Sequence, residues 1–175
     1  MTRVIVMTEF ATYQGELDLS TPGGQDIRLL DALNTPSRLR HGAGQAEPSL
    51  RLTHAIRRSR RDQSATPCGE AVVIRPTEVL AAFEDEEKTK ETVAVYERRQ
   101  EIVGERVLIH CTGNLRLEGV IRGGVQTLQI TKAARPFVAC TDVMLLDLET
   151  SAPPVIIPFM GFNLARVESY GPAPG

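Results

Sequence analysis

The stretch Arg106-Val-Leu-Ile-His-Cys-Thr-Gly-Asn-Leu-Arg-Leu-Glu-Gly-Val-Ile121 decides the fold class. Its first six residues form a mostly apolar run, and Thr112-Gly-Asn114 has the composition of a tight turn. From Leu115 onward, apolar and polar residues alternate with a period of two. Because successive side chains of a strand point to opposite faces, this pattern predicts a β-hairpin.

Further short β segments follow, and breakers separate them. Gly123-Gly124 interrupts the second strand, and Pro153-Pro154 ends a long β-prone run. The expected strands are Thr127–Thr131, Phe137–Leu148, Val155–Ile157 and Leu164–Val167, with a turn at Pro158–Asn163. Short strands with frequent breakers are typical of an all-β barrel or sandwich.

The first part of the chain repeats these blocks in the same order. The matching pairs are Arg3–Val6 with Arg106–Ile109, Gln14–Leu17 with Glu118–Ile121, Leu52–Ala55 with Cys140–Val143, Ala71–Pro76 with Pro154–Phe159, and Leu80–Phe83 with Leu164–Val167. Chance alternation is the other explanation for the match. Two copies in one chain favour a tandem duplication over a solenoid.

The first copy contains segments that do not have a strand pattern. Asp26–Leu33 carries apolar residues at helical spacing, which predicts a short helix with Asp26 as N-cap; a strand is the alternative. Ser37–Ser49 is nearly free of large apolar residues and predicts a flexible loop, and Arg57–Gly69 predicts a polar loop. The expected strands are Arg3–Thr8, Thr12–Leu19, Leu50–Ile56, Ala71–Arg75 and Val79–Phe83.

A helix is expected at residues 87–104, between the two copies. Lys88–Val103 has no breaker, acids precede it, and Arg98-Arg99 lies near its end, which suits the helix dipole. Gly104 fits the position after the last helical residue. The expected organisation is a first copy at 1–86, this helix, a second copy at 105–170 and a tail at 171–175.

Composition points to a soluble protein. The net charge is −2, and no apolar run approaches the ~20 residues that a membrane span requires. The N-terminus becomes charged too early for a signal peptide. Three cysteines without framework spacing suit a reducing compartment, so we expect a cytoplasmic location without a membrane partner.

The order of helix, hairpin with a central glycine, short apolar strand, turn and Leu-Ala-x-Val strand resembles the Sm-like (SH3-like) small β-barrel family. Val72–Leu80 and Val155–Leu164 both resemble the last hairpin of that family. Arg28–Asn34, followed by Leu52-Thr-His-Ala55, is similar to an uncharacterised bacterial domain-of-unknown-function family. The resemblance implies two tandem five-stranded barrels joined by one α-helix, with RNA binding and ring assembly.

The RNA-binding signature of Sm-like proteins has an Asp-x-x-x-Asn-type motif and an Arg-Gly near the last hairpin. The first copy offers Asp31-Ala-Leu-Asn34 and Arg75-Pro76, which match only in part. The second copy has Gly124-Val-Gln-Thr127 and Pro158 at these places, without the acid or the arginine. The resemblance therefore places an RNA pocket only in the first copy.

The residues that carry chemistry do not form a recognisable catalytic or metal motif. Cys68, Cys111, Cys140 and His110 lack C-x-x-C or H-x-x-x-H spacing, and neighbouring strand residues point to opposite faces. Cys111 and Cys140 are expected to be buried, while His41 and His54 are expected at the surface or on a strand. We therefore expect no cofactor, no metal and no enzymatic activity.

Arginines concentrate between residues 38 and 61. Glu47 is the one acid before Asp62 in this region, and the arginines are Arg38, Arg40, Arg51, Arg57, Arg58, Arg60 and Arg61. Three interpretations stay open: a solvated loop, a surface that contacts nucleic-acid phosphates, or a surface for an acidic protein partner.

Three functions follow. The favoured one is a non-catalytic interaction or assembly module, which self-associates as a homo-oligomer or docks a protein partner through exposed strand edges. The second is an RNA- or DNA-binding regulator, whose binding residues would be Arg57, Arg58, Arg60, Arg61, Arg75, Asp31 and Asn34. The third is an enzyme or small-ligand sensor with a site between the copies.

Overall fold

The computed structural model describes residues 1–41, 47–84, 104–130, 135–150 and 152–174. The chain is mostly β with two short helices in these ranges, which confirms the all-β class. Eleven strands form one sheet in the order β11-β7-β8-β9-β10-β6-β1-β2-β3-β4, and β5 pairs with β3. The expected five-stranded barrels are not separate sheets, because β10 pairs with β6 and the sheet continues from one half to the other.

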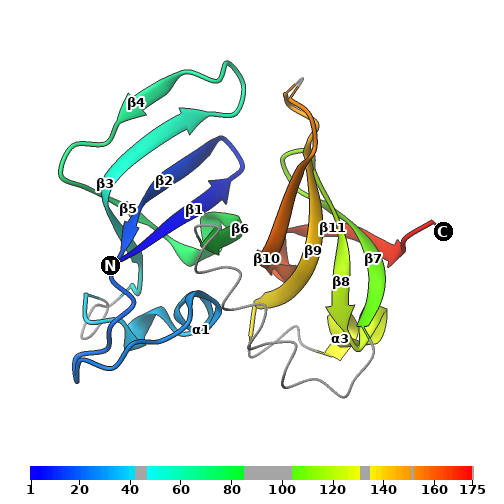
Figure 1. The fold of residues 1–175 in the computed structure, drawn as a ribbon, viewed down its shortest axis with the longest axis horizontal. Helices are drawn as coiled ribbons and strands as arrows, with labels where there is room; N and C mark the ends of the chain where they lie inside the picture. The colour runs from blue at the N-terminus through cyan, green and yellow to red at the C-terminus, as the bar shows by residue number, and fades with distance from the viewer. Residues whose placement is uncertain (42–46, 85–103, 131–134, 151, 175) are drawn as a thin grey trace.

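Figure 1 shows two lobes that meet where β10 lies beside β6. The elements of the first half are β1 (Thr2–Thr8), β2 (Ala11–Leu17), α1 (Leu29–Asn34), η1 (Pro36–Arg38), β3 (Leu50–Ser59), β4 (Ala65–Pro67), β5 (Ala71–Ile74), η2 (Pro76–Glu78) and β6 (Val79–Glu84). Those of the second half are β7 (Gly104–Cys111), β8 (Leu115–Arg122), α3 (Gly124–Ile130), β9 (Phe137–Asp147), β10 (Val155–Asn163), η3 (Leu164–Arg166) and β11 (Val167–Pro172).

Both halves have the same strand order, β6-β1-β2-β3-β5 in the first and β11-β7-β8-β9-β10 in the second. Both also bend at the same place. The β2–β3 register shifts next to Gly15, and the β8–β9 register shifts next to Gly119. Opposite these glycines, His54 and Asp142 have φ values of 50° and 49°. A bulge accounts for both features, since the extra residue of a bulge bends its strand.

The last strands of the two halves also correspond. A 3₁₀ turn precedes both β6 and β11, and the pairing of each with its neighbour shifts near its start. These shared features relate the halves residue by residue: Val4 to Val107, Gly15 to Gly119, His54 to Asp142, Pro76 to Leu164 and Val79 to Val167. We call such residues corresponding positions.

Several expected boundaries in the second half are wrong. Thr127–Thr131 was expected as a strand, but Gly124–Ile130 is the helix α3, which buries Gly124 and Leu128 four residues apart. Pro158–Asn163 was expected as a turn but lies within β10. Leu164–Arg166 is a 3₁₀ turn, so the last strand begins only at Val167. The strand pairings therefore align the last two repeat blocks differently from the sequence match, by several residues. Val72, for example, corresponds to Met160.

The first half differs from expectation mainly in its arginine-rich segment. The expected loop Arg57–Gly69 is instead a hairpin: β3 runs to Ser59, paired with β2, and β4 returns beside it. A helix occurs within Asp26–Leu33 as favoured, but Arg28 rather than Asp26 is its N-cap. In the expected loop Ser37–Ser49, Leu39 is buried; residues 42–46 lie outside the described residues, as does the expected helix at 87–104 apart from Gly104.

Two apolar cores lie on either side of the junction, and each includes side chains from the other half. One combines second-half residues with Met7, Leu80 and Ala81. The other combines first-half residues with Phe137. Because burial of apolar surface stabilises both cores, the halves are held together by more than their strand pairing.

Candidate functional site: the junction and the outer sheet edges

The junction between the halves is an edge-to-edge strand pairing. Gly161 of β10 pairs with Ala82 of β6, and Phe162 pairs with Ala81, in antiparallel orientation. Phe162 is completely buried. A side chain at position 161 would lie about 3 Å from Leu30 and Leu33 of α1, so glycine lets this helix pack over the junction.

Side chains of the second half cap the turn that precedes β6. The Asn163 amide donates to the Val79 carbonyl at 3.0 Å, and its oxygen accepts from the Ala165 N–H. The Arg166 guanidinium donates twice to the Thr77 carbonyl, at 2.9 and 2.7 Å. Turn carbonyls at an edge otherwise depend on water, so these donors fix η2 against the second half.

Arg60 makes a buried polar contact across the junction. Its side chain is 2% exposed and forms a bidentate pair with Asp147, with distances of 2.8 and 2.6 Å. The remaining guanidinium N–H groups donate to the carbonyls of Thr8, Glu9 and Gly113. All five donors of the group are thereby used, which is what a buried guanidinium requires. Arg60 is therefore not part of an exposed arginine cluster.

The other two residues of the expected RNA pocket in α1 have different environments. Asn34 donates to the Phe137 carbonyl at 3.0 Å and accepts from the Phe137 N–H at 2.9 Å. This side chain therefore joins α1 to the start of β9 across the junction. Asp31 forms a partly exposed ion pair with Arg28 on the same helix. The structure does not bring Asp31 and Asn34 to Arg75 through any described contact.

The remaining arginines do not form one continuous surface. Arg57 pairs with Tyr13, and Arg58 pairs with Thr12, so the two side chains leave opposite faces of β3. Arg61 is exposed beyond the strand end. None of these three has an acidic partner within the described residues. Arg75 is 65% exposed and lies 3.4 Å from Glu47.

Each end of the sheet presents a strand without a further partner among the described pairings. In the first half this strand is β5, with Val73 62% exposed, and the short β4 continues along the same side of β3. In the second half it is β11, which pairs only with β7. An unpaired strand edge is a template for pairing with another chain.

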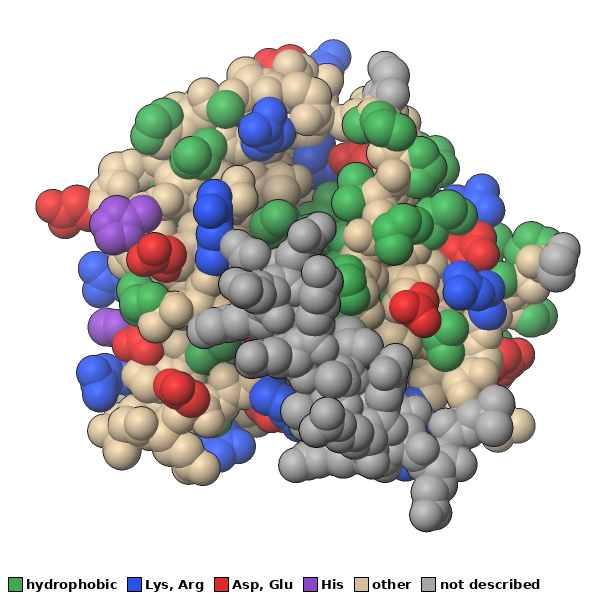
Figure 2. Space-filling view, in the orientation of Figure 1, with side chains coloured by type: hydrophobic (Ala, Val, Ile, Leu, Met, Phe, Trp, Pro, Cys, Tyr) green, Lys and Arg blue, Asp and Glu red, His purple; other side chains and the backbone are tan. Residues whose placement is uncertain are grey.

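A groove of about 280 Å³ lies where β10 diverges from the first half. Its lining residues are Arg3, Val4, Ile5, Gln14, Phe83, Glu84, Val155, Ile156, Ile157 and Pro158. Figure 2 shows hydrophobic side chains on both sides of the region between the lobes. The described lining residues include no histidine, cysteine or serine.

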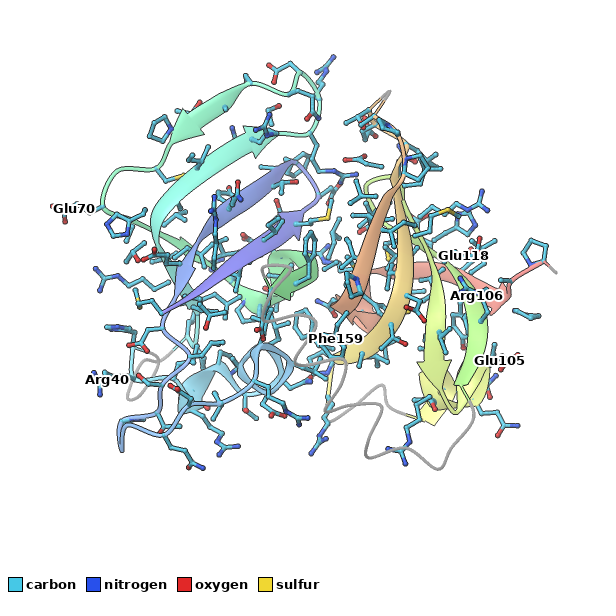
Figure 3. The ribbon with its side chains drawn as sticks, viewed as in Figure 1. Arg40, Glu70, Glu105, Arg106, Glu118 and Phe159 are labelled. Carbon is cyan, nitrogen blue, oxygen red and sulfur yellow. The ribbon has the colours of Figure 1, made fainter. Side chains whose placement is uncertain are left out.

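The positions that correspond to the groove residues Arg3 and Gln14 are Arg106 and Glu118 of the second half. Figure 3 labels both residues at the right of the view, away from the groove. Their side chains pair at 3.7 Å. Glu105, on the other face of β7, accepts from the Val125 N–H at the start of α3. The outer face of β7 and β8 therefore carries the Arg106–Glu118 ion pair where the first half has the groove.

The cysteines are in the environments expected from the sequence. Cys111 and Cys140 are buried, and burial raises the pKa of each thiol to about 12. Cys68 is partly exposed. Among the described residues, three or more His, Cys, Asp or Glu side chains do not gather as a metal site would require.

Sequence reasoning missed the polar residues of the junction, namely Asp147, Asn163 and Arg166. Asp147 ends an apolar run and Asn163 lies in a segment expected to be a turn, so neither had a pattern that marked it.

Comparison of the chain with protein-family models, curated proteins and solved structures found no match. Within the described residues, the helices are too short or too polar to cross a bilayer.

Proposed function

We propose that the protein is a non-catalytic assembly module, built of two duplicated Sm-like barrels, that self-associates through its outer sheet edges. The observation that carries this proposal is the β10–β6 junction, where the edge of one half adds directly to the edge of the other. Strand addition of this kind uses main-chain hydrogen bonds and needs no catalytic group.

The same pairing is available between molecules. By the correspondence between the halves, β10 is related to β5, and β6 is related to β11. Gly161 and Phe162 correspond to Val73 and Ile74, while Ala82 and Ala81 correspond to Tyr170 and Ser169. An intermolecular junction that repeats the internal one therefore pairs Val73 with Tyr170 of a second copy.

Such a contact joins different surfaces of the two molecules. Because the interface is heterologous, repeated addition forms a closed ring if the rotation closes and a filament if it does not. Arg75 corresponds to Asn163, which caps the η2 turn at the internal junction. A guanidinium at this place can donate to the carbonyls around η3 of the neighbouring molecule, which supports the same direction of assembly.

Sedimentation velocity over a range of protein concentrations tests this function. We expect species heavier than the 19.2 kDa chain, and we expect Val73→Asp to dissociate them by placing a charge at the edge. Gln25→Glu is the control, since it adds the same charge at an exposed turn position. A constant 19.2 kDa mass at every concentration contradicts the proposal.

A nucleic-acid-binding regulator is the alternative, and the unpaired Arg57, Arg58 and Arg61 favour it. Their positions on both faces of the strand weaken it, as does the engagement of Arg60 with Asp147. Fluorescence anisotropy with labelled oligonucleotides separates the two functions. Salt-sensitive binding that disappears when these three arginines become serine supports the alternative, and unchanged or absent binding contradicts it.

A further inference from the structure

The internal junction joins the halves by more than the strand pairing of β10 with β6. One further contact is made by Arg60 with Gly113 and Asp147 at the tips of the second half. The turn between β1 and β2 takes part as well, since the Glu9 side chain lies against Gly113. If the same junction forms between two molecules, it must therefore bring together the turns that correspond to those around Arg60 and around Gly113 and Asp147.

The residues at these tips follow from equivalent backbone hydrogen bonds. The Arg60 N–H donates to the Phe10 carbonyl at 3.0 Å, and the Leu148 N–H donates to the Asn114 carbonyl at 2.9 Å. Leu148 thus corresponds to Arg60, and Phe10 corresponds to Asn114. Gly113 and Asp147 correspond to Glu9 and Ser59, which flank Phe10 at the far tip of the first half.

Two large apolar side chains are exposed at these positions. Phe10 is 71% exposed and Leu148 is 54% exposed, and they lie just after the ends of β1 and β9. Val73 at the β5 edge is exposed as well. Exposed apolar side chains that recur along one line of contact mark an interaction surface more strongly than single ones do.

We infer that Leu148 of one molecule packs against Phe10 of a second copy, beside Glu9 and Ser59, the positions that correspond to the Gly113 and Asp147 partners of Arg60 within the chain. The inference rests on the proposed function and specifies its partner surface. The internal contact is buried and fully hydrogen-bonded, so it holds the halves together permanently. The external contact is apolar and closes only when a second copy covers it.

The difference also determines which halves join. A first-half tip carries Phe10 and a second-half tip carries Leu148, so the external contact is completed only between unlike ends of two molecules. Like ends would bring β5 to β5 or β11 to β11, which are not the complementary edges that the internal junction pairs. Assembly is therefore head to tail.

Variants with opposite charges test the contact. Phe10→Asp and Leu148→Arg each replace an exposed side chain, and each is expected to weaken self-association roughly tenfold or more, as loss of a central apolar anchor does. An equimolar mixture of the two variants is expected to recover assembly. One junction then pairs the introduced arginine of one chain with the introduced aspartate of the next, and the alternate junction keeps the original Leu148 and Phe10.

Sedimentation velocity and thermal unfolding provide the readouts. Unchanged melting temperatures show that the variants fold. If the wild type assembles but both variants assemble equally well, or if the mixture stays dissociated, this inference is wrong and the proposed function stands. If the wild type itself remains at 19.2 kDa, both are wrong.

Discussion

The two halves share a backbone plan but differ in what their equivalent tips carry. In the first half, Arg60 directly follows β3, and it is buried and paired with Asp147 of the other half. In the second half, Leu148 directly follows β9 and is exposed. The same position thus serves a permanent contact in one half and an open surface in the other. A tandem arrangement can therefore contain one closed junction and leave an equivalent one for a second molecule.

The bulge glycines give the largest expected effect, and they test whether the halves bend alike. A Cβ at Gly119 would lie 2.5 Å from Cys140 Sγ and 2.9 Å from the Thr141 carbonyl. Gly119→Val should therefore lower the free energy of unfolding by about 3 kcal/mol through overpacking. Urea denaturation measures this change.

Two further glycines complete the comparison. Gly15→Ala should cost less, because its nearest contacts are at 3.0 Å and beyond. Gly171→Ala is the control, since a Cβ there meets no atom within 4 Å. A Gly119→Val protein as stable as the Gly171→Ala protein would refute the role of the bulge.

Arg60→Met tests the buried contact between the halves. It leaves Asp147 without its partner in a mostly buried place, so we expect a loss of about 2–3 kcal/mol of stability. Arg61→Met, one residue later and exposed, should change stability by less than about 0.5 kcal/mol. Equal losses in chemical denaturation would show that the junction does not depend on Arg60.

Asn34→Ala should have an intermediate effect. It removes both hydrogen bonds to the Phe137 backbone, at a cost of about 1–3 kcal/mol. Asp31→Ala breaks only a partly exposed ion pair and should cost less than about 1 kcal/mol. If Asp31→Ala lowers the melting temperature more than Asn34→Ala does, Asn34 does not join α1 to the second half.

The smallest expected effect is a decline of stability in mild alkali. The folded-state pKa of Cys111 and Cys140 is raised to about 12 by burial, against 9.0 for an ordinary thiol. The unfolded chain therefore releases protons first as pH rises, and each thiol costs a few tenths of a kcal/mol at pH about 9. Urea midpoints at pH about 7 and about 9 should differ less in a Cys111→Ala/Cys140→Ala protein than in the wild type. Equal differences would show that these thiols do not cause the decline.

Local patterns predicted much of the fold because period-two alternation reports directly on strands. It identified the hairpins of both halves and, with helical spacing, the short helix at Leu29–Asn34. It failed for Gly124–Ile130, where the alternation of Leu128 and Ile130 suits either structure. It also failed for Pro158, because a proline at a strand edge does not end the strand when its missing N–H faces away from a partner.

The candidate site was less predictable, because it depends on contacts between residues far apart in the sequence. Arg60 and its neighbours all appeared as one basic run, yet only Arg60 meets Asp147, 87 residues later. The edge-to-edge junction had no local signal either. It follows from which strands remain unpaired, and sequence alone does not specify that.

A disulfide between molecules tests the central claim most directly. In a Cys68→Ser background, Val73→Cys and Tyr170→Cys are introduced together, because opposed residues of neighbouring strands are close enough for a disulfide to form. The account predicts a ladder of covalent oligomers on mild oxidation. It predicts little ladder when Gly171→Cys replaces Tyr170→Cys, since a shift by one residue turns the side chain to the other face. Absence of the ladder, or equal ladders in both proteins, would contradict assembly through these edges.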